Sequence, residues 1–302
     1  MSKFCALKSA GMGNRLKMYV SYLARYDEVL VEKNEDRYLF PDFKSCDREE
    51  DIKENAWTHS GWRLLVDENE EDYIEKYKTI DQLYNDTPQY FIDKYVPIWQ
   101  KLKINPDIKE YIDDFTKEWD KDDMVGIHLR TNFPPVDDGT RSVWVDFNGF
   151  EKEVQKYSSS QKFFLASDWK PAIDYYTLKY PNQIITHPKN DIVRHDSVDN
   201  FQQSADSFID MYLLSQCYKK QIFTFGTTFS ECSWWFGECR AEVVMPTLWD
   251  KVPRYFFDNV YNLKNTMYNL NGEQVAAEGC RTYAPLNVGD NYKIKDWKVI
   301  YG

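Results

Sequence analysis

Polar side chains that can bind an anion follow the apolar runs of this sequence. Arg130 comes directly after the apolar run 124–129, and His128 lies two residues before it, so both side chains leave the same face of an extended strand. A permanently charged guanidinium beside a buried strand needs an anionic partner, either a ligand or a neighbouring carboxylate. His128 is either a ligand contact or a core histidine with its hydrogen bonds satisfied. The pattern therefore indicates an anion site or an internal ion pair at this strand end.

Three other segments offer groups of the same kind. The turn at Gly11 and Gly13 leads from a short strand into a helix; it is either a plain tight turn or a cradle that aims N–H groups at an anion. Thr227 and Thr228 open another helix, where hydroxyls serve as caps or as phosphate donors. Asp168 ends a further strand and is alternatively a helix cap. Together these groups suit a diphosphate, because fixed positive charge and backbone dipoles can stabilise a leaving phosphate.

Motifs for other phosphate and metal sites are missing from the sequence. There is no GxxxxGK[ST] run, which excludes a P-loop kinase or ATPase. The GxGxxG fingerprint is incomplete because Leu16 stands at the third glycine, and this disfavours an NAD(P)-dependent sugar epimerase or dehydrogenase. The 4 histidines and 6 cysteines are dispersed, with no HExxH or CxxC spacing. We therefore expect no metal site and no bound cofactor.

Alternating strands and helices must position these groups. The apolar runs that read as strands in the second half of the chain are 124–129, 163–166, 183–186 and 221–225. Helical stretches lie between them, which predicts a parallel sheet with helices on both faces and ligands beyond the carboxyl ends of its strands. The first residues show a strand, a glycine turn, a helix and a second strand at 28–32. The sequence therefore predicts an α/β fold.

Length and charge set further limits. The 302 residues suggest two domains at about 150 residues each. We expect one domain over 1–120, a second domain over 121–254, and a further segment over 255–302. The net charge of −11 makes nucleic acid and anionic membranes poor partners. Because no apolar run approaches the roughly 18 residues of a membrane span and no signal-peptide pattern is present, we expect a soluble, cytoplasmic protein.

Four segments resemble, in order, motifs of the fucosyltransferase superfamily. These segments are SAGMGNRL at 9–16, VGIHLR at 125–130, FFLASD at 163–168 and DMYLLSQC through FGTTFS at 210–230. The set is most similar to the α1,6-fucosyltransferase and nodulation fucosyltransferase group. The run FSECSWWFG at 229–237 also resembles bacterial α1,2-fucosyltransferases. The resemblance implies a GT-B-like architecture, in which two Rossmann-type domains face each other across a cleft. It also implies that the domain over 121–254 binds a nucleotide sugar and that the segment 255–302 packs back on the first domain.

The resemblance also implies a reaction, the inverting, metal-independent transfer of L-fucose from GDP-fucose to a hydroxyl of a glycan acceptor. Arg130 would bind the diphosphate and stabilise its departing charge by bidentate hydrogen bonding. His128 and Asp210 would contact the guanine, and Asp168 would lie near the nucleoside. The donor-binding residues that it implies at the diphosphate are Gly13, Asn14, Thr227 and Thr228.

The α1,6 group places its catalytic carboxylate a few residues after the motif that VGIHLR at 125–130 resembles. Here Asp138, or its neighbour Asp137, would take the proton of the acceptor hydroxyl; the alternative is a solvated acidic turn. The sequence departs from the family at 131–133, where Thr-Asn-Phe replaces a second basic residue and an aspartate. This departure leaves open a glycosyltransferase for another nucleotide sugar. A catalytically inactive GDP-sugar-binding protein is a further alternative.

Overall fold

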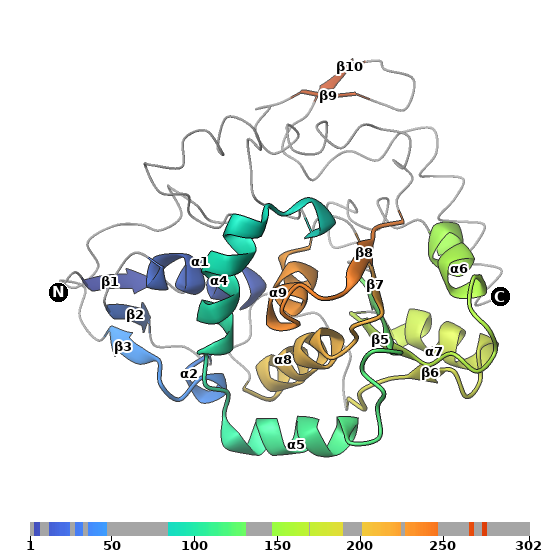
Figure 1. Ribbon diagram of the computed structural model, residues 1–302, viewed down its shortest axis with the longest axis horizontal. Coiled ribbons are helices and arrows are strands. Elements are labelled where there is room, and N and C mark those ends of the chain that lie inside the picture. The colour runs from blue at the N-terminus through green and yellow to red at the C-terminus, as the bar shows by residue number, and fades with distance from the viewer. Residues whose placement is uncertain are drawn as a thin grey trace. The chain divides into compact units, whose positions relative to one another are not determined.

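The computed structural model shows the fold of the chain (Figure 1). It describes residues 3–6, 12–24, 28–32, 36–46, 84–130, 147–168, 170–189, 201–224, 227–246, 266–268 and 274–276. The chain divides into two compact units. The first unit comprises Met1–Met124, His195–Lys220 and Gly226–Val243, and the second comprises Val125–Arg194, Gln221–Phe225 and Val244–Gly302. The predicted domains 1–120 and 121–254 and the predicted packing of 255–302 stay predictions.

The first unit holds a parallel sheet of three strands in the order β1-β2-β3. Its strands are β1 (Lys3–Ala6), β2 (Glu28–Glu32) and β3 (Lys44–Cys46). Lys3 pairs with Glu28. Helix α1 (Met12–Leu23) lies between β1 and β2 in the chain, and its apolar residues at helical spacing, such as Leu16 and Val20, are buried. The predicted order of strand, helix and strand is therefore confirmed.

The helices of the first unit are packed through aromatic side chains. These helices are α2 (Asp36–Leu39), the 3-10 turn η4 (Tyr84–Asp86), α4 (Gln89–Gln100), α5 (Pro106–Thr116), α8 (Phe201–Ser215) and α9 (Thr228–Phe236). Phe91, Tyr95 and Trp99 recur every fourth residue on α4 and are fully buried. Tyr95 and Trp99 meet Trp235 and Phe236 of α9, with ring centroids 6.2 and 4.8 Å apart. Much of the aromatic content thus fills the core.

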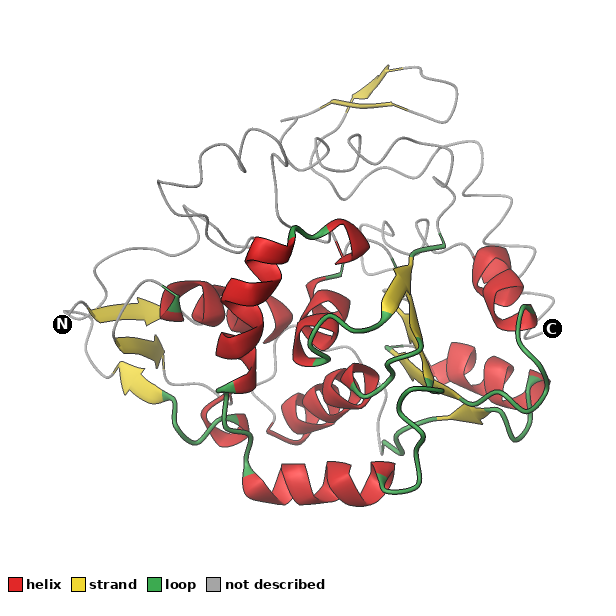
Figure 2. Ribbon diagram, in the orientation of Figure 1, coloured by secondary structure: helices red, strands yellow, loops and turns green. Residues whose placement is uncertain are grey.

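The second unit is built on a parallel sheet. Its elements in chain order are β4 (Val125–Leu129), α6 (Phe147–Gln155), β5 (Phe163–Ser167), α7 (Lys170–Lys179) and β6 (Ile184–Ile185). Val125 pairs with Phe163, and Phe163 with Ile184. Helices α6 and α7 lie on one side of this sheet (Figure 2). They pack on it through Phe150 and Tyr176, which join the odd-numbered residues of β4 and β5 in a fully buried core. The predicted parallel α/β sheet is confirmed.

The full sheet has five strands in the order β6-β5-β4-β7-β8, with β7 (Lys220–Phe223) and β8 (Glu242–Val244). After β4 the chain adds β5 and β6 on one side and later returns to place β7 on the other side. The strand order therefore reverses between β4 and β7, and ligands of open α/β sheets bind at the carboxyl ends of strands at such a switch point. A separate antiparallel pair joins β9 (Thr266–Tyr268) to β10 (Gln274–Ala276). None of the helices in the described ranges is long and apolar enough to cross a bilayer.

Candidate functional site

The carboxyl end of β4 is held by hydroxyl groups from both neighbouring strands. The backbone N–H of Arg130 donates to Thr224 Oγ1 at 3.0 Å, and the N–H of Thr224 donates to the carbonyl of His128 at 3.0 Å. On the other side, Ser167 Oγ donates to the carbonyl of Leu129 at 2.7 Å. Because Thr224 directly follows β7 and Ser167 ends β5, the backbone at Arg130 is fixed at the switch point of the sheet.

Arg130 forms an ion pair with Asp168 at this strand end. The Nε atom of Arg130 lies 3.2 Å from Asp168 Oδ2, and the two side chains are 26% and 11% exposed. This is the internal carboxylate partner that the sequence allowed as one of two possibilities. Asp168 orients the guanidinium while leaving it in contact with solvent, so the pair is compatible with a ligand. The predicted binding of a diphosphate by Arg130 and of a nucleoside near Asp168 stay predictions.

His128 lies within the sheet rather than in solvent. The odd-numbered residues of β4 face helices α6 and α7, so the His128 side chain points to the opposite face. Its side chain is 3% exposed, and its ring meets Phe223 edge-to-face with centroids 6.4 Å apart. The predicted contact of His128 with guanine stays a prediction.

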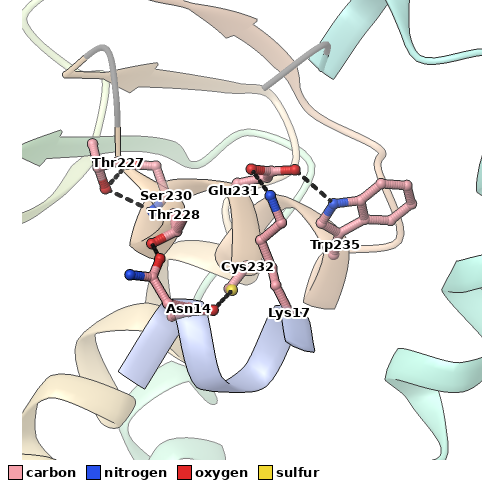
Figure 3. Close-up of polar contacts among 9 residues, drawn as sticks. Asn14, Lys17, Thr227, Thr228, Ser230, Glu231, Cys232 and Trp235 are labelled. Atoms are coloured by element: carbon pink, nitrogen blue, oxygen red, sulfur yellow. Dashed lines mark hydrogen bonds and ion pairs between the residues drawn. The ribbon is translucent and has the colours of Figure 1, made fainter. Parts of the chain in front are cut away.

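The first turn of α1 meets the first turn of α9 within the first unit, where Asn14 lies beside Thr228 (Figure 3). A Cβ atom on Gly13 would lie 2.9 Å from the backbone N of Phe229 and 3.0 Å from the carbonyl carbon of Thr228, so glycine is needed for this close approach. The hydroxyl of Thr228 donates to Asn14 Oδ1. Thr227 caps α9, since its Oγ1 accepts from the N–H of Ser230 at 3.2 Å.

The structure thus brings four of the predicted phosphate contacts together. Gly13, Asn14, Thr227 and Thr228 lie at the adjoining N-terminal ends of α1 and α9. Each helix N-terminus carries a partial positive charge, and two such ends side by side favour an anion between or beside them. The binding of phosphate by these four residues stays a prediction.

Asp210 lies on α8 of the first unit and is 3% exposed. Burial raises the pKa of Tyr111 on α5, and the nearby negative charges of Asp206 and Asp210 raise that pKa further. The carboxylate of Asp210 is therefore close enough to Tyr111 for its charge to disfavour ionisation of the Tyr111 hydroxyl. The predicted contact of Asp210 with guanine stays a prediction.

The predicted catalytic carboxylates, Asp137 and Asp138, lie outside the described residues. Within the described ranges, no group of three His, Cys, Asp or Glu side chains could hold a metal ion.

A buried ion pair between α1 and α9 was not predicted from the sequence. Lys17 Nζ donates to Glu231 Oε2 at 2.7 Å, and the two side chains are only 1% and 2% exposed. Trp235 Nε1 donates to the other carboxylate oxygen, Oε1, at 3.4 Å. One signal was available: Glu231 is the sole charged residue in the helix TFSECSWWF. An isolated charge in an apolar helix requires a buried partner.

Solved structures of fucosyltransferases resemble this fold. Fucosyltransferase NodZ from Bradyrhizobium is 15% identical, with a TM-score of 0.51, over 82% of this chain and 94% of that chain. NodZ α-1,6-fucosyltransferase soaked with GDP-fucose is 16% identical, with a TM-score of 0.48, over 78% and 92%. POFUT1 in complex with GDP is 12% identical, with a TM-score of 0.42, over 80% and 97%. No protein-family model matches the sequence, and no curated protein is significantly similar to it.

The likeness to Bradyrhizobium NodZ shows that this chain has a fucosyltransferase-like α/β fold. The fold expected from the sequence motifs is therefore confirmed. The arrangement of two domains across a cleft stays a prediction.

Proposed function

We propose that the protein is an inverting, metal-independent glycosyltransferase that moves L-fucose from GDP-fucose to a hydroxyl group of a glycan. The observation that carries the proposal is Arg130, which lies at the carboxyl end of the central strand β4, at the switch point of a fucosyltransferase-like fold. Arginine is suited to this place because its planar fork can bind two phosphate oxygens at once.

In the proposed reaction, the bond between the fucose anomeric carbon and the β-phosphate oxygen breaks as a bond to the acceptor oxygen forms on the opposite face. Negative charge develops on the departing GDP, and the guanidinium of Arg130 stabilises that charge. The helix N-termini at Asn14 and Thr228 supply further positive potential to the diphosphate. Asp138, or Asp137, takes the proton of the acceptor hydroxyl. Fixed charges and dipoles of the protein thus do the work for which other transferases use a metal.

Asp168 has a supporting part in this proposal. Its carboxylate lies 3.2 Å from the Nε atom of Arg130 and orients the guanidinium for the diphosphate in this scheme. The hydrogen bond from Arg130 N–H to Thr224 fixes the backbone at the last described residue before Asp137 and Asp138 in the sequence. His128 and Asp210 recognise guanine in this scheme, and this is the basis for preferring a GDP-sugar over other donors.

A thermal-shift panel with GDP, UDP, ADP, CMP and GDP-fucose, in buffer with EDTA, tests the donor class. We expect GDP and GDP-fucose to raise the melting temperature, because a ligand at 100 times its Kd adds about 2.7 kcal/mol of stability. The other three nucleotides should have little effect. A preference for UDP would favour a glycosyltransferase with another nucleotide sugar. No stabilisation by any of the five would contradict the proposed function.

A further inference from the structure

Helices α1 and α9 approach each other so closely in their first turns that their relative position has little freedom. At Gly13 the backbone of α1 touches the backbone of α9 at Thr228 and Phe229. The Cys232 thiol, one turn along α9, donates to the carbonyl of Gly13 at 3.2 Å and is fully buried. Backbone atoms and small side chains thus make this contact. A small shift of one helix would therefore change all the distances between α1 and α9 there.

The buried ion pair lies one turn deeper in the same contact. Lys17 is four residues after Gly13 on α1, and Glu231 is three residues after Thr228 on α9. Figure 3 shows the Lys17 side chain reaching across from α1 to Glu231, with Trp235 on the other side of the carboxylate. The pair therefore joins the two helices that carry Asn14 and Thr228.

Stability alone is a poor explanation for this pair. Removing two charges from water offsets most of their attraction, and apolar side chains of similar volume often serve a fold equally well. An ion pair differs from an apolar contact in that its atoms must meet in one geometry. It also opposes the repulsion between the two helix N-termini, which both carry partial positive charge.

We propose that the Lys17–Glu231 pair is a positioning element, which fixes α1 on α9 in the one register that holds the Asn14 amide and the Thr228 hydroxyl together. The inference rests on the proposed function in one respect, that these residues border the diphosphate of the donor. The Thr228 hydroxyl holds the amide oxygen of Asn14, so the amide nitrogen points away from α9, as Figure 3 shows. A shift of the helices would break that contact and turn the amide donor out of place.

The double variant Lys17→Met/Glu231→Gln tests the proposal. It removes both charges at similar volume, and the glutamine oxygen can still accept from Trp235, so the variant should fold with a melting temperature near that of the wild type. We expect its Kd for GDP, measured by calorimetry, to rise by about 10- to 100-fold because the site is misplaced. The matched control is Lys109→Met/Asp113→Asn, which makes the same change in an exposed pair on α5 and should leave the Kd unchanged.

Alkylation of Cys232 measures the helix contact without any ligand. Site-resolved mass spectrometry should show Cys232 reacting with iodoacetamide about tenfold faster in the double variant, because opening of the contact exposes the thiol. Cys217 is an internal control: it is fully buried just after α8, its thiol donates to the carbonyl of Leu213, and burial raises its pKa. Its rate should stay as in the wild type.

A double variant with wild-type GDP affinity and a wild-type Cys232 rate would overturn the proposal. If the wild-type protein itself binds no GDP, the proposed function fails, and the Cys232 rate alone decides whether the pair fixes the register. If the double variant does not fold, Glu231→Asp replaces it, because this change keeps both charges and moves the carboxylate back by one methylene. The proposal expects the same two changes in that variant, and their absence would overturn it.

Discussion

Replacing Arg130 by Ala should lower kcat/KM for GDP-fucose by about 10³-fold, or about 4 kcal/mol of transition-state stabilisation. The guanidinium brings positive charge to the switch point of the sheet, where the leaving diphosphate gains negative charge in the proposed reaction. Its loss should therefore act more on turnover than on the fold. The hydrogen bond to Thr224 comes from the backbone N–H and does not need the side chain. Steady-state kinetics with purified variant and wild type measures the effect.

Arg130→Lys is the matched control for charge. Lysine keeps the positive charge but offers no planar fork, so bidentate binding of two phosphate oxygens is lost. We expect the activity of this variant to lie between those of Arg130→Ala and the wild type. Both variants should unfold within a few degrees of the wild type, because the side chain is partly exposed. Full activity of a folded Arg130→Ala protein would show that Arg130 does not stabilise the leaving diphosphate.

Replacing Lys17 by Met should lower the free energy of unfolding by about 3–5 kcal/mol. The substitution leaves the Glu231 carboxylate buried without its cation, since both side chains of the pair are at most 2% exposed. An uncompensated buried charge is far more costly than a lost pair, which is why the single variant should be worse than the double variant with Glu231→Gln. Urea titration at neutral pH gives the free energies of unfolding of all three proteins.

Lys109→Met serves as the reference for this measurement. The Lys109–Asp113 pair lies on the exposed side of α5, with side chains 42% and 57% exposed. Pairs of this kind contribute at most about 1 kcal/mol, and the variant should differ little from the wild type. If Lys17→Met is no less stable than Lys109→Met, Lys17 does not neutralise a buried Glu231 carboxylate in the folded protein.

The sequence predicted the parts of the fold that depend on residues close together in the chain. The apolar runs 124–129 and 163–166 are buried strands, and the apolar residues of α1, such as Leu16 and Val20, are buried as well. Arg130 was predicted at a strand end because the apolar run stops there. The order of strands in the sheet has no local cause, and so the switch point between β4 and β7 required the structure.

Contacts between distant segments account for what sequence could not predict. Lys17 and Glu231 are 214 residues apart, and so are Asn14 and Thr228. Nothing in the composition of α1 distinguishes Lys17 from a solvated lysine. The sequence also left two roles each for Thr227 and Asp168; the structure shows a helix cap for the first and an ion pair with Arg130 for the second.

The proposed function requires that the protein transfers the sugar rather than only binding its donor. The most direct measurement incubates the protein with GDP-fucose and a panel of oligosaccharide acceptors in EDTA, and follows released GDP together with the mass of each acceptor. We expect GDP to accumulate in step with an acceptor that gains one deoxyhexose, linked with the anomeric configuration opposite to that of the donor. GDP-fucose that binds to the protein but is recovered intact, with no product and no slow hydrolysis, would rule out the proposed transfer.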